Sequence, residues 1–338
     1  VSIMSANLLC DHATKVTLMS APMTHPRSRR LLYMIHRLDS FWRLGVCCES
    51  ASIARYYETH THSERLFVLM ESTDGDLGRL LSASQVRMPQ GVAENVAASR
   101  ESILRGREAD WAPWRGTAMN LDRALLLLAD ILSGIRDLEK AGILHANLSP
   151  ESILLKNGRG IIAGLGDACV EHGGEDNVDL HCYSLADSAH GVVGSAFYQA
   201  PEMILGVPTG PSNHAWAAGL LLARMLFGYD PTRRTMLLQR PSEFQNSLLD
   251  TQEHSRGYIR QVLRGHFDIQ QDPSFVYMKR DVKVLLAGLL DNDPEARWTS
   301  AQALEFVERM LDRRGMGVPE PRRRESLPED WRAQDAWQ

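Results

Sequence analysis

HANLSPESILL, at residues 145–155, is the most informative segment of this chain, because it separates two different periodic patterns. Before it, apolar residues recur at helical spacing in a segment that Asn120 caps and Gly142 ends. After it, two short β-type runs surround Asn157-Gly158, a dipeptide typical of a two-residue hairpin turn. We therefore expect a polar loop between a long amphipathic helix and a β-hairpin.

Helical patterns dominate the chain beyond this loop. Residues 215–227 are apolar nearly all round, which predicts a helix that is buried on every side. Two amphipathic helical patterns follow, at 281–290 and 300–312. Before the loop, residues 28–46 form another helical pattern, and short β-type runs lie at 55–57 and 66–70. This order predicts an α+β chain with a small, mostly β front end and a helical body.

Three longer segments lack a periodic pattern and are expected to be loops: 82–118, 165–195 and 232–256. The first is polar and carries Trp111 and Trp114, so it is either a solvated loop or a docking surface. The other two are further candidate surfaces for a protein partner, because loops on a rigid scaffold often carry function.

The composition is that of an ordinary globular chain. Its 338 residues are 44% hydrophobic and 23% charged, and a formal net charge of −5 does not favour nucleic-acid binding. No run of about 18 apolar residues predicts a membrane span. Because the chain begins with Val1, we expect a processed or trimmed product. The cysteines have no metal-ligand spacing and their pairing stays open: Cys10, Cys47, Cys48, Cys169 and Cys182.

Four further segments stand in order around HANLSPESILL: 66–81 with GDL at 75–77, GSAFY at 194–198, APE at 200–202 and DPEAR at 293–297. Together they resemble the protein kinases, whose catalytic loop reads H-R-D-L-x-x-x-N and whose activation segment ends in A-P-E. The resemblance covers residues 10–312, approximately, and implies a bilobal kinase-like fold of the α+β class.

The resemblance also implies a division of the chain. It places a reduced N-lobe without a glycine-rich loop at 1–72 and a helical C-lobe at 73–312. Within these lobes it places helix C at about 28–46, the insertion at 82–118 and an activation-like loop at 165–202, with a tail at 313–338.

The catalytic positions depart from the family pattern. Kinases use an aspartate of the catalytic loop to accept the proton of the hydroxyl, and oxygen ligands to hold Mg²⁺. By resemblance Asn147 stands at that aspartate, and a neutral amide does not act as a base. Ser149 stands at the lysine of the loop, Ser152 at its metal-binding asparagine and Gly164 at the aspartate of D-F-G. We expect these four positions to be degenerate, with no catalytic residue and no bound metal.

Asp167 is the acid that follows Gly164 three residues later. Three residues of extended chain span about 10 Å, and a Mg²⁺–oxygen bond is only about 2.1 Å long. On that basis we do not expect Asp167 to replace the missing side chain.

The front end also lacks the features that hold nucleotide. No glycine precedes Gly45, so the first strands carry no glycine-rich loop. His12-Ala13-Thr14-Lys15 resembles the V-A-I-K strand, which makes Lys15 a weak candidate for binding phosphate. Equally open is the reading of Lys15 as an ordinary exposed lysine, since residues 28–46 contain no glutamate to pair with it.

By resemblance, Glu202 and Arg297 form a buried ion pair that ties the activation segment to the helical body. Because a broken buried pair leaves an uncompensated charge, we expect this pair to be structural.

These observations predict a catalytically inactive pseudokinase that acts as a protein-interaction or scaffold module, without a cofactor and without bound ATP. The missing glycine loop resembles the secreted with-no-Gly-loop kinase-like family of apicomplexan parasites, and within it the bradyzoite-stage pseudokinases. That resemblance implies secretion through dense granules to the parasitophorous vacuole or cyst wall, and unidentified protein partners. Two alternatives stay open: a non-catalytic nucleotide-binding switch that uses Lys15, and a kinase with rearranged catalytic chemistry.

Overall fold

The computed structural model describes residues 2–7, 15–43, 50–83, 119–170, 198–204, 210–227 and 273–316. Most of the insertion expected at 82–118, most of the loop expected at 165–195, the loop at 232–256 and the tail from 317 lie outside these residues. So do Cys10, Cys47, Cys48 and Cys182.

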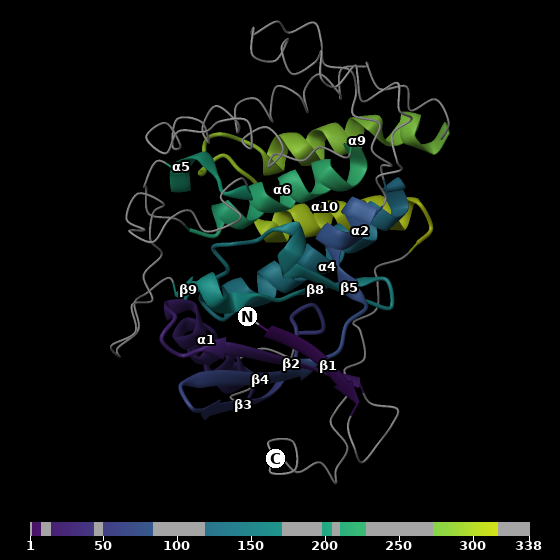
Figure 1. Ribbon diagram of the computed structural model, residues 1–338. Coiled ribbons are helices and arrows are strands. Elements are labelled where there is room, and N and C mark those ends of the chain that lie inside the picture. Colours follow the sequence, from purple (N-terminus) through teal and green to yellow (C-terminus); the bar gives the residue numbers. More distant parts are fainter. Residues whose placement is uncertain are drawn as a thin grey trace, which may run out of the picture.

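A four-stranded antiparallel sheet forms the smaller lobe, with the strand order β1-β2-β4-β3 (Figure 1). The strands are β1 (Ser2–Asn7), β2 (Lys15–Pro22), β3 (Tyr56–His62) and β4 (Arg65–Glu71). The only helix of this lobe in the described part of the chain is α1 (Pro26–Arg43), at the expected helix of 28–46. Buried side chains of α1, among them Met34 and Leu38, share one core with Leu66 and Val68 of β4. Buried side chains of β4 therefore join the sheet to the helix.

Helices build the larger lobe around α4 (Leu121–Lys140), which packs against α6 (Ser212–Phe227) and α10 (Ser300–Arg313). The expected cap is confirmed, because the Asn120 side chain accepts a hydrogen bond from the Arg123 backbone N–H over 2.9 Å. Gly142 ends the segment with φ 65°, a left-handed conformation that suits glycine. Nearly every described residue of α6 is buried, as predicted from its apolar sequence.

Three further helices complete the described part of this lobe: α2 (Leu77–Ala83), α5 (Pro201–Ile204) and α9 (Pro273–Leu289). The helix predicted at 281–290 thus begins eight residues earlier than expected. Pro273 at its first position is a start signal that the apolar pattern alone did not include. No described helix combines the length and apolarity that a bilayer crossing needs.

Short strands position the loop at 145–152. Strands β7 (Ile153–Lys156) and β8 (Arg159–Ile162) form the predicted hairpin, with positive φ at Asn157 and Gly158 as a type I′ turn requires. Strand β5 (Gly75–Asp76) pairs with β7. A second small ladder joins β6 (Ile143–Leu144) to β9 (Cys169–Val170). Residues 145–152 and 163–168 therefore leave adjacent strands and lie side by side.

Candidate functional site

His145 fixes the start of the loop from inside the protein. Its side chain is fully buried, and its Nε2–H donates to the carbonyl oxygen of Ala163 over 2.8 Å. Burial lowers the pKa of His145 to about 4, so the ring is neutral at neutral pH. Its Nδ1 is then free to accept a hydrogen bond from the backbone N–H of Asn147 over 3.4 Å. The imidazole thus links the loop to the segment that precedes Gly164.

A line of polar contacts holds His145 from the helical lobe. The backbone N–H of His145 donates to Nε2 of His214 in α6 over 2.8 Å. Nδ1 of His214 lies 3.0 Å from a carboxylate oxygen of Glu139 in α4, and the Ser300 hydroxyl of α10 donates to the other oxygen. Three helices therefore determine the position of the loop.

Ala146 carries the backbone strain of the loop. Its φ of 56° is left-handed, a conformation that a residue with a Cβ rarely adopts. The side-chain amide of Gln199 donates to the Ala146 carbonyl oxygen over 3.3 Å, and the Asn147 N–H donates to the His145 carbonyl over 2.7 Å. Strain of this kind persists where surrounding contacts enforce it, and such places are often functional sites.

Asn147, Asp167 and Arg27 meet at the tip of the loop. Nδ2 of Asn147 donates to Oδ2 of Asp167 over 2.7 Å, and Nε of Arg27 lies 2.6 Å from Oδ1 of the same carboxylate. The side chains of Asp167 and Arg27 are 16% and 45% exposed. Oδ1 of Asn147 is buried and has no hydrogen-bond partner within the described residues. The cluster therefore combines a carboxylate, an unused amide acceptor and a partly exposed cation.

The local backbone explains why Asp167 reaches Asn147. Gly164 has φ 82°, and the 3₁₀ turn η3 (Leu165–Asp167) follows it directly. A 3₁₀ turn advances only about 2 Å per residue, so the extended-chain distance assumed from the sequence is wrong for this segment. The backbone of Gly164 also forms a hydrogen bond with the hydroxyl of Tyr56. Burial raises the pKa of this hydroxyl above its ordinary value. Tyr56 thereby holds the start of the turn.

The positions that resemble metal ligands supply no free ligand. Gly164 has no side chain, and the Ser152 hydroxyl donates to the Ser149 carbonyl over 2.8 Å while it accepts from the Ser149 N–H over 2.9 Å. No cluster of three or more His, Cys, Asp or Glu side chains suited to a metal occurs in the part of the chain that the structure describes. Asp167 is already paired with Arg27. These residues do not fit a protein-held Mg²⁺ of the kind that kinases use.

Lys15 is the first residue of β2 and pairs with Asn7 of β1, outside the β2–β4 ladder that begins at Val16. Its side chain lies outside the described residues. Met19, four residues further along the strand, packs among Tyr56, Ile161 and Ala163. The residue of β2 that faces the segment next to Gly164 is therefore apolar.

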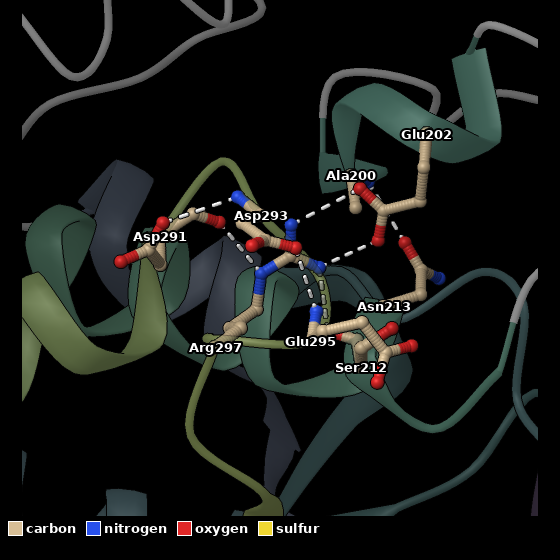
Figure 2. Close-up of polar contacts among 8 residues, drawn as sticks. All are labelled: Ala200, Glu202, Ser212, Asn213, Asp291, Asp293, Glu295 and Arg297. Carbon is tan, nitrogen blue, oxygen red and sulfur yellow. Dashed lines mark hydrogen bonds and ion pairs between the residues drawn. The ribbon is translucent and has the colours of Figure 1, made fainter.

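Glu202 and Arg297 lie together, away from this cluster. The two guanidinium Nη atoms of Arg297 donate to the two carboxylate oxygens of Glu202 over 2.6 and 3.0 Å, and its Nε donates to the Asp291 carbonyl over 2.9 Å (Figure 2). The Arg297 guanidinium also lies 5.1 Å from the centre of the Trp216 ring. All these contacts join α5, α6 and the turn before α10.

The sequence did not indicate Arg27, His214 or Gln199 as members of the site. One signal was available for Arg27, because the first turn of α1 carries arginines and no acid, against the usual preference at a helix start. His214 and Gln199 act through contacts across long sequence separations, which no local pattern contains.

Comparison with known proteins places these features among kinases. The family described as "Protein kinase domain" matches residues 43–307, from the end of α1 into α10. A serine/threonine-protein kinase of Drosophila erecta is 26% identical over 193 residues, which are 56% of this chain and 22% of that protein. Calcium-dependent protein kinase 28 of Oryza sativa subsp. japonica is 26% identical over 181 residues, which are 54% of this chain and 29% of that kinase. Calcium-dependent protein kinase 17 of Arabidopsis thaliana is 27% identical over 189 residues, with the same two shares.

The chain thus spans less than a third of the length of these relatives. Their names correct one prediction made from the sequence. We expected a chain that is not an enzyme, but the proteins that it matches are named as protein kinases. The matches therefore point to a kinase and contradict the prediction of a pseudokinase.

Proposed function

The chain belongs to the protein kinase domain family, and from this premise we propose that it transfers the γ-phosphoryl group of ATP to a serine or threonine hydroxyl with a rearranged catalytic site. The observation that carries the proposal is the hydrogen bond of 2.7 Å between Asn147 and Asp167. It places a carboxylate next to the residue that stands where the family has its catalytic aspartate.

Asp167 takes the role of proton acceptor in this proposal. Asn147 cannot accept the proton of a hydroxyl, because an amide is not a base near neutral pH. Oδ2 of Asp167 uses one lone pair for the Asn147 amide, and a second lone pair of that oxygen remains to face a substrate hydroxyl. In this proposal Asn147 positions the base, whereas in other kinases the aspartate at this position is itself the proton acceptor.

Two donors orient the Asp167 carboxylate from opposite elements. Asn147 belongs to the loop of the larger lobe and Arg27 to α1 of the smaller lobe. A carboxylate held by two charge-assisted or amide hydrogen bonds has little rotational freedom, and orientation of the reacting groups is a large part of phosphoryl transfer.

The acceptor class follows from the relatives. One of them is named as a serine/threonine-protein kinase, and we extend that acceptor class to this chain as part of the proposal. Regulation by calcium, which appears in the names of other relatives, is not extended, because the chain matches only 29% of their length.

The test is a direct assay of phosphoryl transfer by the purified chain. The chain is incubated with ATP labelled at the γ-phosphate and with a degenerate serine/threonine peptide library, once with Mg²⁺, once with Mn²⁺ and once with chelator. We expect labelled peptide in at least one condition, with label on serine or threonine by mass spectrometry. Absence of labelled peptide in all three conditions, with a known kinase active in the same assay, would overturn the proposal.

We also propose that the chain works in an oxidising, secreted setting, as the finer resemblance to the apicomplexan secreted family implies. One observation supports this: buried Cys169 of β9 is disulfide-bonded, and disulfides persist mainly in secretory compartments. The compartment is tested by detecting the chain with an antibody in fractions of the source cells. Recovery in the vesicular or extracellular fraction is expected, whereas recovery only with cytosolic markers contradicts secretion.

A further inference from the structure

We infer that Arg27, and not a protein-held Mg²⁺, supplies the positive charge that neutralises the transferring phosphoryl group, so that transfer by this chain proceeds without a divalent cation. The inference rests on the proposed function and names the cation of the same site.

The ligand set of the site argues against a metal. Mg²⁺ requires near-octahedral oxygen ligands, with one or two carboxylates besides phosphate oxygens and water. Gly164 offers no oxygen from a side chain, and both hydrogen-bonding roles of the Ser152 hydroxyl are used by Ser149. Asp167 has one oxygen bound by Asn147 and the other by Arg27. To bind Asp167, a metal cation would have to displace the Arg27 guanidinium, which is also positively charged.

Arg27 already stands where a cation is needed. Its Nε is 2.6 Å from a carboxylate oxygen of Asp167, the proposed proton acceptor, and Arg27 forms no second ion pair within the described part of the chain. Its side chain is 45% exposed, so a ligand can reach part of it. A guanidinium is charged at all physiological pH values and presents paired N–H groups that match phosphate oxygens.

The surroundings of Arg27 favour an anion as well. Pro26 begins α1, and its first turn contains Arg27 and no acidic residue. The start of a helix is its positive end, where proteins usually place acids. Gly166 of η3 lies against the start of the helix, where a Cβ at this position would be 3.4 Å from the Cβ of Arg27. The positive helix end is therefore held directly over the Asp167 carboxylate.

Stability alone does not account for this contact. Ion pairs with a partner as exposed as Arg27 contribute little to folding, since solvent screens them. The same pair lies between the two lobes and beside the buried, unpartnered Oδ1 of Asn147. A role toward a ligand explains the combination better than a structural role does.

The reaction balances with these groups. The hydroxyl oxygen of the substrate forms a bond to the γ-phosphorus, and its proton passes to Asp167. The bond between the γ-phosphorus and the β–γ bridging oxygen breaks, and ADP leaves with the bonding electrons. Arg27 donates through Nη to the phosphate oxygens on which negative charge accumulates, as an arginine does in other phosphoryl transfers.

The experiment compares wild type with Arg27→Ala, Arg27→Lys and the control Arg29→Ala, which changes an exposed arginine two residues further along the same helix. Two quantities are measured with EDTA and with Mg²⁺: the affinity for a fluorescent ATP analogue, and the rate of phosphoryl transfer to peptide. Circular dichroism and thermal unfolding confirm that each variant is folded.

We expect wild type to bind the analogue and transfer phosphate in EDTA at a rate within about threefold of the rate in Mg²⁺. Arg27→Ala is expected to weaken binding in EDTA at least tenfold and to slow transfer roughly 100-fold or more. Arg27→Lys is expected to recover part of both quantities, and Arg29→Ala to leave them unchanged.

Three other results count against the inference in distinguishable ways. Transfer by wild type in Mg²⁺ but not in EDTA removes the role of Arg27 and leaves the proposed kinase function standing. No transfer in either condition removes the proposed function and this inference together. Equal effects of Arg27→Ala and Arg29→Ala show a general charge effect on the helix and also count against the inference.

Discussion

Nδ2 of Asn147 donates a hydrogen bond of 2.7 Å to Oδ2 of Asp167, across 20 residues of sequence. This contact joins the loop that resembles the kinase catalytic loop to the 3₁₀ turn that follows Gly164. An amide and a carboxylate thus share the place where the family pattern has a single aspartate. The site therefore still contains an acidic group, but the carboxylate belongs to Asp167, which is hydrogen-bonded to residue 147.

Asn147→Asp tests how close these two groups are. A second carboxylate within hydrogen-bond distance of Asp167 repels it, so the pKa of the introduced carboxyl group is raised in the folded chain. A carboxyl whose pKa is higher when folded stabilises the protein at low pH and loses that effect as the pH rises through the folded pKa. We expect the variant to be less stable than wild type at pH 8, and the deficit to shrink at pH 5, in urea unfolding.

Asn120→Asp is the matched control for that experiment, because it makes the same chemical change at an exposed helix cap where aspartate is also preferred. Its stability relative to wild type is expected to depend little on pH. Equal pH dependence of the two variants would contradict the geometry at Asn147.

Arg297→Ala is expected to destabilise the chain by about 3–5 kcal/mol, because it leaves the buried Glu202 carboxylate without its partner. The same substitution also removes the contact with the Trp216 ring. Urea unfolding of the purified variant measures the loss. Arg313→Ala breaks an exposed ion pair with Asp281 and serves as control, with an expected change below about 1 kcal/mol.

The pair itself is tested by adding Glu202→Gln to Arg297→Ala. Removing the charge from the remaining partner is expected to recover part of the lost stability. An unchanged unfolding curve for Arg297→Ala would show that the pair is not a structural clamp.

His145→Gln tests the neutral, buried imidazole. The pKa of His145 is lowered to about 4 by burial, so the unfolded chain binds more protons than the folded chain as the pH falls below about 6.5. Wild type therefore loses stability from this residue between pH 6.5 and 4, and the uncharged variant does not. We expect the stability advantage of wild type over His145→Gln to be about 2 kcal/mol smaller at pH 5 than at pH 7.

Unfolding in urea at both pH values, with His60→Gln on the outer strand β3 as control, gives this difference. A stability advantage of wild type that stays constant across the two pH values would mean that the imidazole is not buried in its neutral form.

Much of the fold was predictable because it depends on local patterns. The Asn120 cap, the turn at Asn157-Gly158 and the apolar helix α6 follow from residue types at fixed spacing, and the structure confirms them. Strand β1 (Ser2–Asn7) was not predicted, because its short polar-apolar mixture gains its order from pairing with β2. The family resemblance assigned Asn147, Ser149 and Ser152 to positions of the catalytic loop and Gly164 to the position of the metal-binding aspartate.

The arrangement of Asp167 and Arg27 was not predictable in the same way. Residues 164–167 were expected to be extended, whereas the left-handed Gly164 turns the chain into a 3₁₀ turn. A residue spacing gives a distance only once the backbone conformation is known. Arg27 joins the cluster from another lobe, and a contact across 140 positions of the sequence leaves no periodic signal.

Asp167→Asn removes the group that we propose as the proton acceptor. The variant keeps the shape of the side chain but replaces the proton-accepting carboxylate with an amide. Transfer of labelled γ-phosphate to peptide is compared with wild type and with Asp281→Asn, an acid of α9 paired with Arg313 far from the site. We expect the transfer rate to fall about 100-fold or more in Asp167→Asn and to stay at the wild-type value in Asp281→Asn, with both variants folded. An undiminished transfer rate in a folded Asp167→Asn variant would contradict the role of Asp167 as proton acceptor.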